Sequence, residues 1–261
     1  MTSLAGFLRQ TAKSILPDSA RRTVNRAATL TRAASARLRL GFGVEPLSYV
    51  WGFDRGQPLH RYYLEQFLEE FRADIRGHCL EFRDDSYTHR YGGAAVAKLD
   101  ILHLDESHPA ATIVADLTKP NDVPSNAFDC IVCTQVLHLI FEVDRAVSEL
   151  WRILKPGGVL LATVPHISMC DPGWHEVWRF TPEGLGALVG KSFGTDGIDV
   201  RAYGNSLTAA GELRGLVAEE FSKATLAYSD PRFALEVCIR AKKASSFQPP
   251  AKSPELLASN S

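Results

Sequence analysis

The sequence predicts one large α/β domain, and two observations in its 261 residues point to this fold class. Short apolar segments that suit buried strands alternate along the chain with segments that suit helices. In residues 149–165, a helical pattern is followed by Lys155-Pro156-Gly157-Gly158 and then by an almost unbroken apolar run at 159–164. Such a run is typical of a strand covered on both faces, as in a sheet with helices on each side.

The Lys-Pro-Gly-Gly element predicts where this helix ends. Pro156 lacks an N–H and disfavours helical backbone at Lys155, so we expect the helix to finish there. Gly157 and Gly158 are both suited to positive φ, which predicts a two-glycine turn that reverses the chain before the strand.

The N-terminal residues differ in charge from the rest of the chain. Residues 1–40 carry eight Lys or Arg against one acid, Asp18, which leaves 21 basic and 29 acidic groups for the remainder. We expect residues 1–45 to form a basic, partly helical extension with a solvated basic face. A transit peptide or a weak membrane-surface contact also fits this composition, but the apolar face is short and Pro17 breaks it. The domain is predicted at 46–243, and a disordered Ser- and Pro-rich tail at 244–261.

Within the domain, an aromatic and Gly-rich loop from residue 49 precedes a helix whose apolar face carries Tyr63, Phe67 and Phe71. A second helix is predicted through residues 144–151. Seven strands are predicted at 79–82, 94–102, 111–116, 128–134, 159–164, 198–203 and 233–239.

The five cysteines predict no disulfide framework, which indicates a reducing compartment and hence a cytoplasmic location. Cys130 and Cys133 are three residues apart in a predicted strand, so they should point to opposite faces. We therefore expect buried thiols rather than a redox pair or a metal site. The chain has no run of about 18 apolar residues, so no transmembrane helix is expected.

Three of the first strands end in, or just before, a carboxylate: Glu81, Asp100 and Asp116. Ligands of open α/β sheets bind beyond the carboxyl ends of the strands. An acid about 20 residues after the first strand commonly binds a ribose diol, and Asp100 follows Glu81 by 19 residues. This spacing favours an adenosine-type ligand, although acids at strand ends also cap helices.

In order along the chain, Leu80-Glu81, Asp100, Asp116 and the segments 127–138 and 145–158 resemble the class I S-adenosylmethionine-dependent methyltransferases. The nearest branch is the small-molecule, methyltransferase type 11-like branch, which carries a Phe-Asp strand and a Leu-Lys-Pro-Gly-Gly element. The resemblance implies a three-layer Rossmann-like methyltransferase fold. Its seven-stranded sheet would be mostly parallel, with an antiparallel last strand.

The resemblance also implies S-adenosylmethionine as the cofactor and assigns residues to it. Glu81 would anchor the loop after the first strand and face the methionine part, and Asp100 would accept hydrogen bonds from the ribose hydroxyls. The other assigned residues are at two further strand ends: Asp116 and Leu117 would frame the adenine, and Thr134 and Gln135 would lie beside the sulfonium.

The loop after Glu81 departs from the family pattern. The family has a glycine-rich loop, whereas residues 82–87 contain no glycine. A Cβ at each position restricts positive φ and narrows the pocket. Asp84 and Asp85 are expected to compensate by attracting the sulfonium charge, which Arg83 opposes.

Methyl transfer to a hydroxyl benefits from a general base such as histidine. The candidates are His166, directly after the fifth strand, and His175 in the following loop. His138 lies between two leucines and is expected to be packed. Trp174, Trp178 and Phe180 suit either stacking on an acceptor or packing within a lid.

The leading hypothesis is a methyltransferase that acts on a small-molecule or sugar-containing acceptor, at oxygen. The alternative is a catalytically impaired scaffold protein of the same fold, suggested by the missing glycines. A nicotinamide-dependent oxidoreductase is disfavoured, because it also needs a glycine-rich first turn. Nucleic acid is not an expected partner, because the chain after residue 40 is acidic and repels phosphate.

Overall fold

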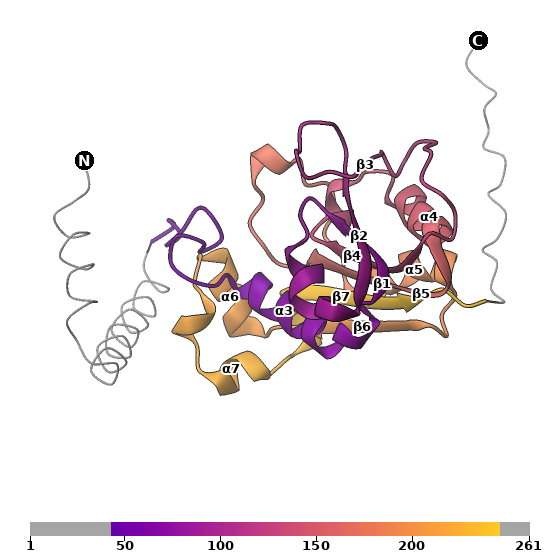
Figure 1. Ribbon diagram of the computed structural model, residues 1–261. Coiled ribbons are helices and arrows are strands. Elements are labelled where there is room, and N and C mark those ends of the chain that lie inside the picture. Colours follow the sequence, from indigo (N-terminus) through magenta and orange to yellow (C-terminus); the bar gives the residue numbers. More distant parts are fainter. Residues whose placement is uncertain (1–42, 246–261) are drawn as a thin grey trace, which may run out of the picture.

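The computed structural model describes residues 43–245, which form a sheet between two layers of helices (Figure 1). Apart from a few residues, the predicted N-terminal extension and C-terminal tail lie outside this part of the chain. The sheet order is β3-β2-β1-β4-β5-β7-β6. The strands are β1 (Gly77–Phe82), β2 (Val96–His103), β3 (Ile113–Val114), β4 (Phe128–Thr134), β5 (Leu154–Pro165), β6 (Ile198–Tyr203) and β7 (Glu236–Lys242).

The last strand, β7, runs antiparallel to both of its neighbours, whereas the pairs from β3 to β5 are all parallel. This arrangement confirms the predicted seven-stranded, mostly parallel sheet with an antiparallel last strand. The α-helices of the described residues are α3 (Leu59–Glu70), α4 (Val143–Ile153), α5 (Pro182–Phe193), α6 (Ser206–Leu213) and α7 (Lys223–Ala227).

Each face of the sheet has its own apolar core. Leu160 and Ala162 of β5 pack into the core beneath α4 and α5, while Val159 and Leu161 pack into the core beneath α3. The unbroken apolar run in β5 is therefore covered on both sides, as predicted. Cys133 and Cys130 divide between the same two cores, which confirms that they face opposite ways.

The prediction for Lys155-Pro156-Gly157-Gly158 was wrong in its geometry. The helix α4 ends at Ile153, and Leu154 already pairs with Phe128 of β4. The next paired residues are Cys130 and Val159, so residues 155–158 form a bulge within β5 rather than a turn before it. Of the two glycines, only Gly157 has positive φ, at 83°. Lys243 holds the bulge, because its backbone bonds both Gly157 and Gly158.

Four other strands also differ from the predictions in their bounds, and the first of them, β1, starts at Gly77, two residues earlier than predicted. Residues 93–95 form a short 3₁₀ turn, so β2 starts later than predicted. The third strand shrinks to Ile113–Val114, the two residues that pair with β2. Before β7, Asp230 accepts a hydrogen bond from Arg232 N and stabilises a turn at residues 231–233, which delays the strand to Glu236.

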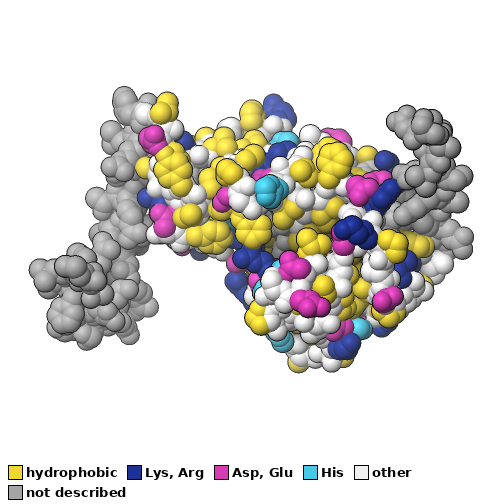
Figure 2. All heavy atoms as spheres, turned by 90° about the horizontal axis from the view of Figure 1, so that it is seen from above, with side chains coloured by type: hydrophobic (Ala, Val, Ile, Leu, Met, Phe, Trp, Pro, Cys, Tyr) yellow, Lys and Arg dark blue, Asp and Glu magenta, His cyan; other side chains and the backbone are white. Residues whose placement is uncertain are grey.

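The α3 helix follows the predicted face at Tyr63 and Phe67, which are fully buried. Phe71, the third residue predicted on this face, follows the end of the helix and is partly buried. No helix within residues 43–245 has the length and hydropathy needed to cross a bilayer. On the face shown in Figure 2, acidic and basic side chains lie interspersed.

Candidate functional site

The strand order places the candidate site between β1 and β4. The chain leaves β1 towards β2 and leaves β4 towards β5, so the direction of winding reverses between these two neighbours. Ligands of such sheets bind beyond the carboxyl ends of the strands at this point. Here those ends are Phe82 and Thr134, followed by the loop 83–88 and by Gln135.

Glu81 anchors the loop that follows β1. Its Oε1 accepts a hydrogen bond from Tyr87 N at 3.1 Å, and its Oε2 accepts one from Thr88 N at 2.8 Å. The side chain is buried, and this burial raises the pKa of Glu81 to about 7 against the opposing bonds from Thr88 and Tyr87. The loop thus folds back over the end of its own strand.

Arg83 takes the backbone conformation that a glycine would supply in this loop. Its φ is +72°, in the left-handed region that L-residues rarely adopt. The next residue, Asp84, is exposed, and its Oδ1 accepts hydrogen bonds from Ser86 N at 3.1 Å and Ser86 Oγ at 2.6 Å. The absence of glycine therefore does not prevent a sharp turn at this position.

Asp100 lies before the end of its strand, and three partners occupy its carboxylate. Lys98 Nζ, His78 Nε2 and Thr112 Oγ1 lie 2.8, 2.6 and 2.9 Å from its oxygens. Burial alone would raise the pKa of Asp100. The bonds from Lys98 and His78 outweigh it and hold this pKa below its ordinary value. His78 and Lys98 come from the first halves of β1 and β2, so these contacts lie away from the carboxyl edge.

The acid that follows the end of β2 is Asp105. Its side chain is 62% exposed, and Oδ1 accepts a hydrogen bond from Ser107 N at 2.8 Å. The bonds from Ser107 lower the pKa of Asp105, so the group is a carboxylate at neutral pH. The sequence analysis did not identify Asp105, because it placed the end of the second strand near Asp100, whereas β2 continues to His103.

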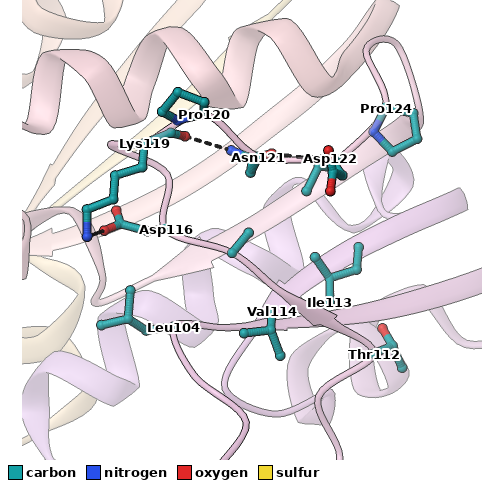
Figure 3. Close-up of a pocket in the computed structure, with 12 residues that line it drawn as sticks. Leu104, Thr112, Ile113, Val114, Asp116, Lys119, Pro120, Asn121, Asp122 and Pro124 are labelled. Carbon is teal, nitrogen blue, oxygen red and sulfur yellow. Dashed lines mark hydrogen bonds and ion pairs between the residues drawn. The ribbon is translucent and has the colours of Figure 1, made fainter.

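Asp116 follows β3 and lines a cavity of about 490 Å³, shown in Figure 3. Its Oδ1 accepts bonds from Thr118 N and Oγ1, and Lys119 Nζ lies 2.9 Å from Oδ2. The bonds from Thr118 and Lys119 lower the pKa of Asp116 to about 2. Val114 of β3 also lines the cavity, and the loops on either side of β3 add Leu104, Asn121 and Asp122. The Leu117 side chain is buried in the core instead.

At the end of β4, Thr134 lies opposite Thr163 of β5, and Gln135 has a positive φ of 56°. Gln135 Nε2 donates to Glu236 Oε1 at 2.5 Å. Glu236 is fully buried, and its burial, followed by the charge of Glu212, raises the pKa of Glu236 well above its ordinary range. The sequence reasoning missed both glutamates. Glu236 could have been noticed in the sequence, because it is the single acid in the apolar segment predicted as the last strand.

The two predicted histidines differ in how they are held. His166 Nδ1 lies 2.8 Å from the Phe180 carbonyl oxygen, which fixes the proton on that nitrogen and leaves Nε2 without a partner among the described residues. His175 is exposed in the following loop with φ of 49°. His138 is buried, and this burial lowers its pKa to about 4, as expected for a packed ring.

The aromatic residues of the loop 166–181 divide between the surface and the core. Trp174 and Trp178 are 44% and 38% exposed, whereas Phe180 is buried. Trp178 Nε1 donates to the carbonyl oxygens of Ile140 and Phe141, which ties the loop to the segment after β4. The loop thus lies beside the ends of both β4 and β5.

Residues 90–162 match the family described as "Methyltransferase domain". The matched region covers β2 to most of β5 and begins after Glu81 and the loop 83–88. No curated protein matches the sequence.

Solved structures with a similar fold share little sequence with this chain. A SAM-dependent methyltransferase from Archaeoglobus fulgidus is 11% identical, with 70% of this chain and 94% of that chain covered at a TM-score of 0.47. An S-adenosylmethionine-dependent methyltransferase from Mesorhizobium loti is 13% identical, with 70% and 97% covered at a TM-score of 0.45. The domain match supports a class I S-adenosylmethionine-dependent methyltransferase of the type 11 branch, with S-adenosylmethionine as its cofactor, and the strand order is the one that the resemblance implied.

Proposed function

We propose that this methyltransferase transfers the methyl group to an oxygen of a small-molecule or glycosidic acceptor. The observation that carries the choice of oxygen is a pair of histidine rings. His166 directly follows β5, and His60 of α3 is linked to the segment after β5 through Glu212 and Ser168. His60 and His166 each have Nδ1 held by an oxygen atom, and among the described residues neither Nε2 has a partner. A hydroxyl must lose its proton as it is methylated, and neutral imidazole is the side chain suited to accept it.

The residues at the carboxyl edge fit the cofactor. Bound S-adenosylmethionine supplies an electrophilic methyl group on a sulfonium. We assign the ribose to Asp105 rather than to Asp100, since Asp105 is exposed and follows the end of β2, whereas three partners occupy Asp100. Asp116 and Leu104 would hold the adenine in the cavity beside β3.

At the other end of the cofactor, the loop that Glu81 anchors would hold the methionine part, with Asp84 on the exposed side. Thr134 and Gln135 would lie beside the sulfonium, because they follow the end of β4. Both assignments follow from the placement of these residues at the switch point.

A catalytically impaired scaffold protein of the same fold is not favoured. That alternative depended on the lack of glycine in the loop after β1, and Arg83 takes the positive φ that a glycine would provide there. The proposed partners remain small molecules rather than nucleic acid, given the acidic balance after residue 40. We also propose a cytoplasmic location and a weak contact of residues 1–45 with a membrane surface, from the cysteine usage and the basic N-terminal composition.

Calorimetry with S-adenosylhomocysteine and a radiolabel assay test this function. We expect the full-length protein to bind S-adenosylhomocysteine and to transfer tritium from S-adenosyl-[methyl-³H]methionine to hydroxyl probes such as phenol or methyl α-D-glucopyranoside. Absence of binding heat at high-micromolar protein would contradict cofactor use. Labelling of amine probes alone would contradict the choice of oxygen.

A further inference from the structure

His60 and Glu212 form a buried pair that the sequence reasoning did not identify. His60 Nδ1 lies 2.9 Å from Glu212 Oε1, and the two side chains are 10% and 0% exposed. The residues are far apart in the chain and meet because α3 packs against α6 (Figure 1). Because the carboxylate accepts, the ring proton belongs on Nδ1, and Nε2 carries the free lone pair.

A second donor, Ser168, also holds Glu212 in place, and Trp51 holds Ser168 in turn. Ser168 Oγ donates to Glu212 Oε1 at 3.3 Å, and Trp51 Nε1 donates to Ser168 Oγ at 3.1 Å. The carboxylate thus accepts from α3 and from the segment after β5, and the loop 49–57 joins the same network through Ser168. Its second oxygen, Oε2, is buried without a hydrogen-bond partner among the described residues.

This network lies next to the part of the site where the methyl group is expected. Ser168 is three residues past Pro165, the last residue of β5. The charge of Glu212 reaches Glu236, which in turn bonds Gln135 at the end of β4. The pair therefore adjoins the acceptor side of the site and not the adenine cavity beside β3.

The surroundings of the other histidines suit a base less well. His166 is held by a peptide carbonyl, which fixes its tautomer but provides no full negative charge to stabilise an imidazolium. His175 is exposed and has no hydrogen bond or ion pair within the described residues. His138 is buried with Nδ1 unpartnered. His78 also has a carboxylate partner, Asp100, but that pair lies away from the carboxyl edge. Among the described residues, His60 is the histidine next to the acceptor side that combines a free Nε2 with a buried carboxylate behind the ring. This arrangement positions a catalytic histidine and stabilises its protonated form.

We propose that His60 is the general base that deprotonates the acceptor hydroxyl and that Glu212 is its positioning residue. The proposal rests on the proposed function. His60 Nε2 would take the hydroxyl proton while the acceptor oxygen bonds the methyl carbon. The carbon–sulfur bond breaks with its electron pair going to sulfur, which yields the methyl ether and S-adenosylhomocysteine. The imidazolium then returns its proton to water.

The test compares variants of the full-length enzyme in the tritium assay, with phenol and methyl α-D-glucopyranoside as probes. We expect His60→Gln to lower kcat by about 100-fold or more. Its affinity for S-adenosylhomocysteine should stay within about twofold of wild type. Glu212→Gln should lower kcat more than KM, and Glu212→Asp should recover part of the loss. Glu183→Gln, which alters an exposed carboxylate on α5, should not change kcat.

Chemical rescue separates a catalytic role from a structural one. His60→Ala should regain activity with added imidazole, which can replace a missing base but cannot repair a misfolded protein. A His60→Gln enzyme within about threefold of wild type would overturn the proposal, as would a His60→Ala loss that imidazole does not restore. If kcat instead falls only with His166→Gln, then His166 is the base and the function itself stands. If wild type binds S-adenosylhomocysteine but labels no hydroxyl probe, both the choice of oxygen and the role of His60 are wrong.

Discussion

The guanidinium carbon of Arg83 lies 4.8 Å from the centre of the Trp174 ring. This cation–π contact joins the loop after β1 to the loop after β5, across the mouth of the candidate site. At exposed positions such contacts contribute about 0.5–1 kcal/mol. Arg83 therefore combines two properties: it takes the positive φ expected of glycine, and it provides a side-chain contact that glycine cannot make.

The strain at Arg83 predicts an unusual order of stability between two variants. Both Arg83→Ala and Arg83→Gly remove the contact with Trp174, so their difference reports on the backbone alone. Because φ is positive, we expect Arg83→Gly to be more stable than Arg83→Ala by about 1 kcal/mol in urea unfolding. Asp84 is a matched control because it lacks positive φ, and there the alanine variant should be the more stable one. Equal stabilities at position 83 would contradict the conformation described for Arg83.

Variants of Asp100 and Asp105 should show that the first residue contributes to stability and the second to cofactor binding. Asp105→Asn should weaken S-adenosylhomocysteine binding about tenfold, since a charge-assisted hydrogen bond to the ribose is lost. Asp100→Asn should leave that affinity within about threefold and instead lower the unfolding free energy by about 1–3 kcal/mol, because His78 and Lys98 lose their buried partner. Calorimetry and urea unfolding measure the two quantities. If Asp100→Asn weakened binding and Asp105→Asn did not, Asp100 would be the residue that binds the ribose.

Features set by local pattern could be predicted from the sequence. The strands 128–134 and 198–203 have the predicted bounds. The first is a largely apolar run, the second alternates apolar and polar residues, and neither contains proline or glycine. The opposite orientations of Cys130 and Cys133 followed from the two-residue period of a strand. The antiparallel last strand followed from the family resemblance and not from any local signal.

Features set by distant partners could not be predicted in this way. Counting 19 residues from Glu81 selected Asp100, but the register pairs Asp100 with Leu80 and lets β2 run on to His103. The bulge at Gly157 and Gly158 depends on the backbone of Lys243, which follows the last strand. His60 and Glu212 lie on separate helices, and no local pattern in either helix marks the pair. In each case the deciding contact joins segments distant in sequence.

Burial of Glu81 predicts that stability falls as the pH rises through the range from about 4.5 to about 7. The folded protein binds the Glu81 proton more tightly than the unfolded chain does, because burial raises the pKa of this group to about 7. Protonation therefore stabilises the fold at low pH, and this contribution, at most about 3 kcal/mol, is lost as pH rises through 7. Urea unfolding of wild type and Glu81→Gln between pH 4.5 and 8 measures it. The stability of wild type relative to Glu81→Gln should decline with pH, and parallel curves would contradict the shift.

Lys243 should contribute much more to stability than its neighbour Lys242. Lys243 is 5% exposed, and its Nζ donates to Asn126 Oδ1 at 2.8 Å, Trp151 O at 2.8 Å and Leu154 O at 2.7 Å. The ammonium thus binds carbonyls at the C-terminal end of α4, where a positive charge is also favoured by the helix dipole. Lys243→Met would leave the Leu154 carbonyl, whose bond with Nζ is buried, without this donor.

We expect Lys243→Met to lower the unfolding free energy by about 2–3 kcal/mol. Lys242→Met is the matched control, because that side chain is exposed, and its effect should stay within about 0.5 kcal/mol. Urea unfolding measures both variants. Similar values for the two would mean that the buried ammonium does not hold the end of α4. A large loss at Lys243 alone would show that a residue after the last strand stabilises the junction from which β5 enters the sheet.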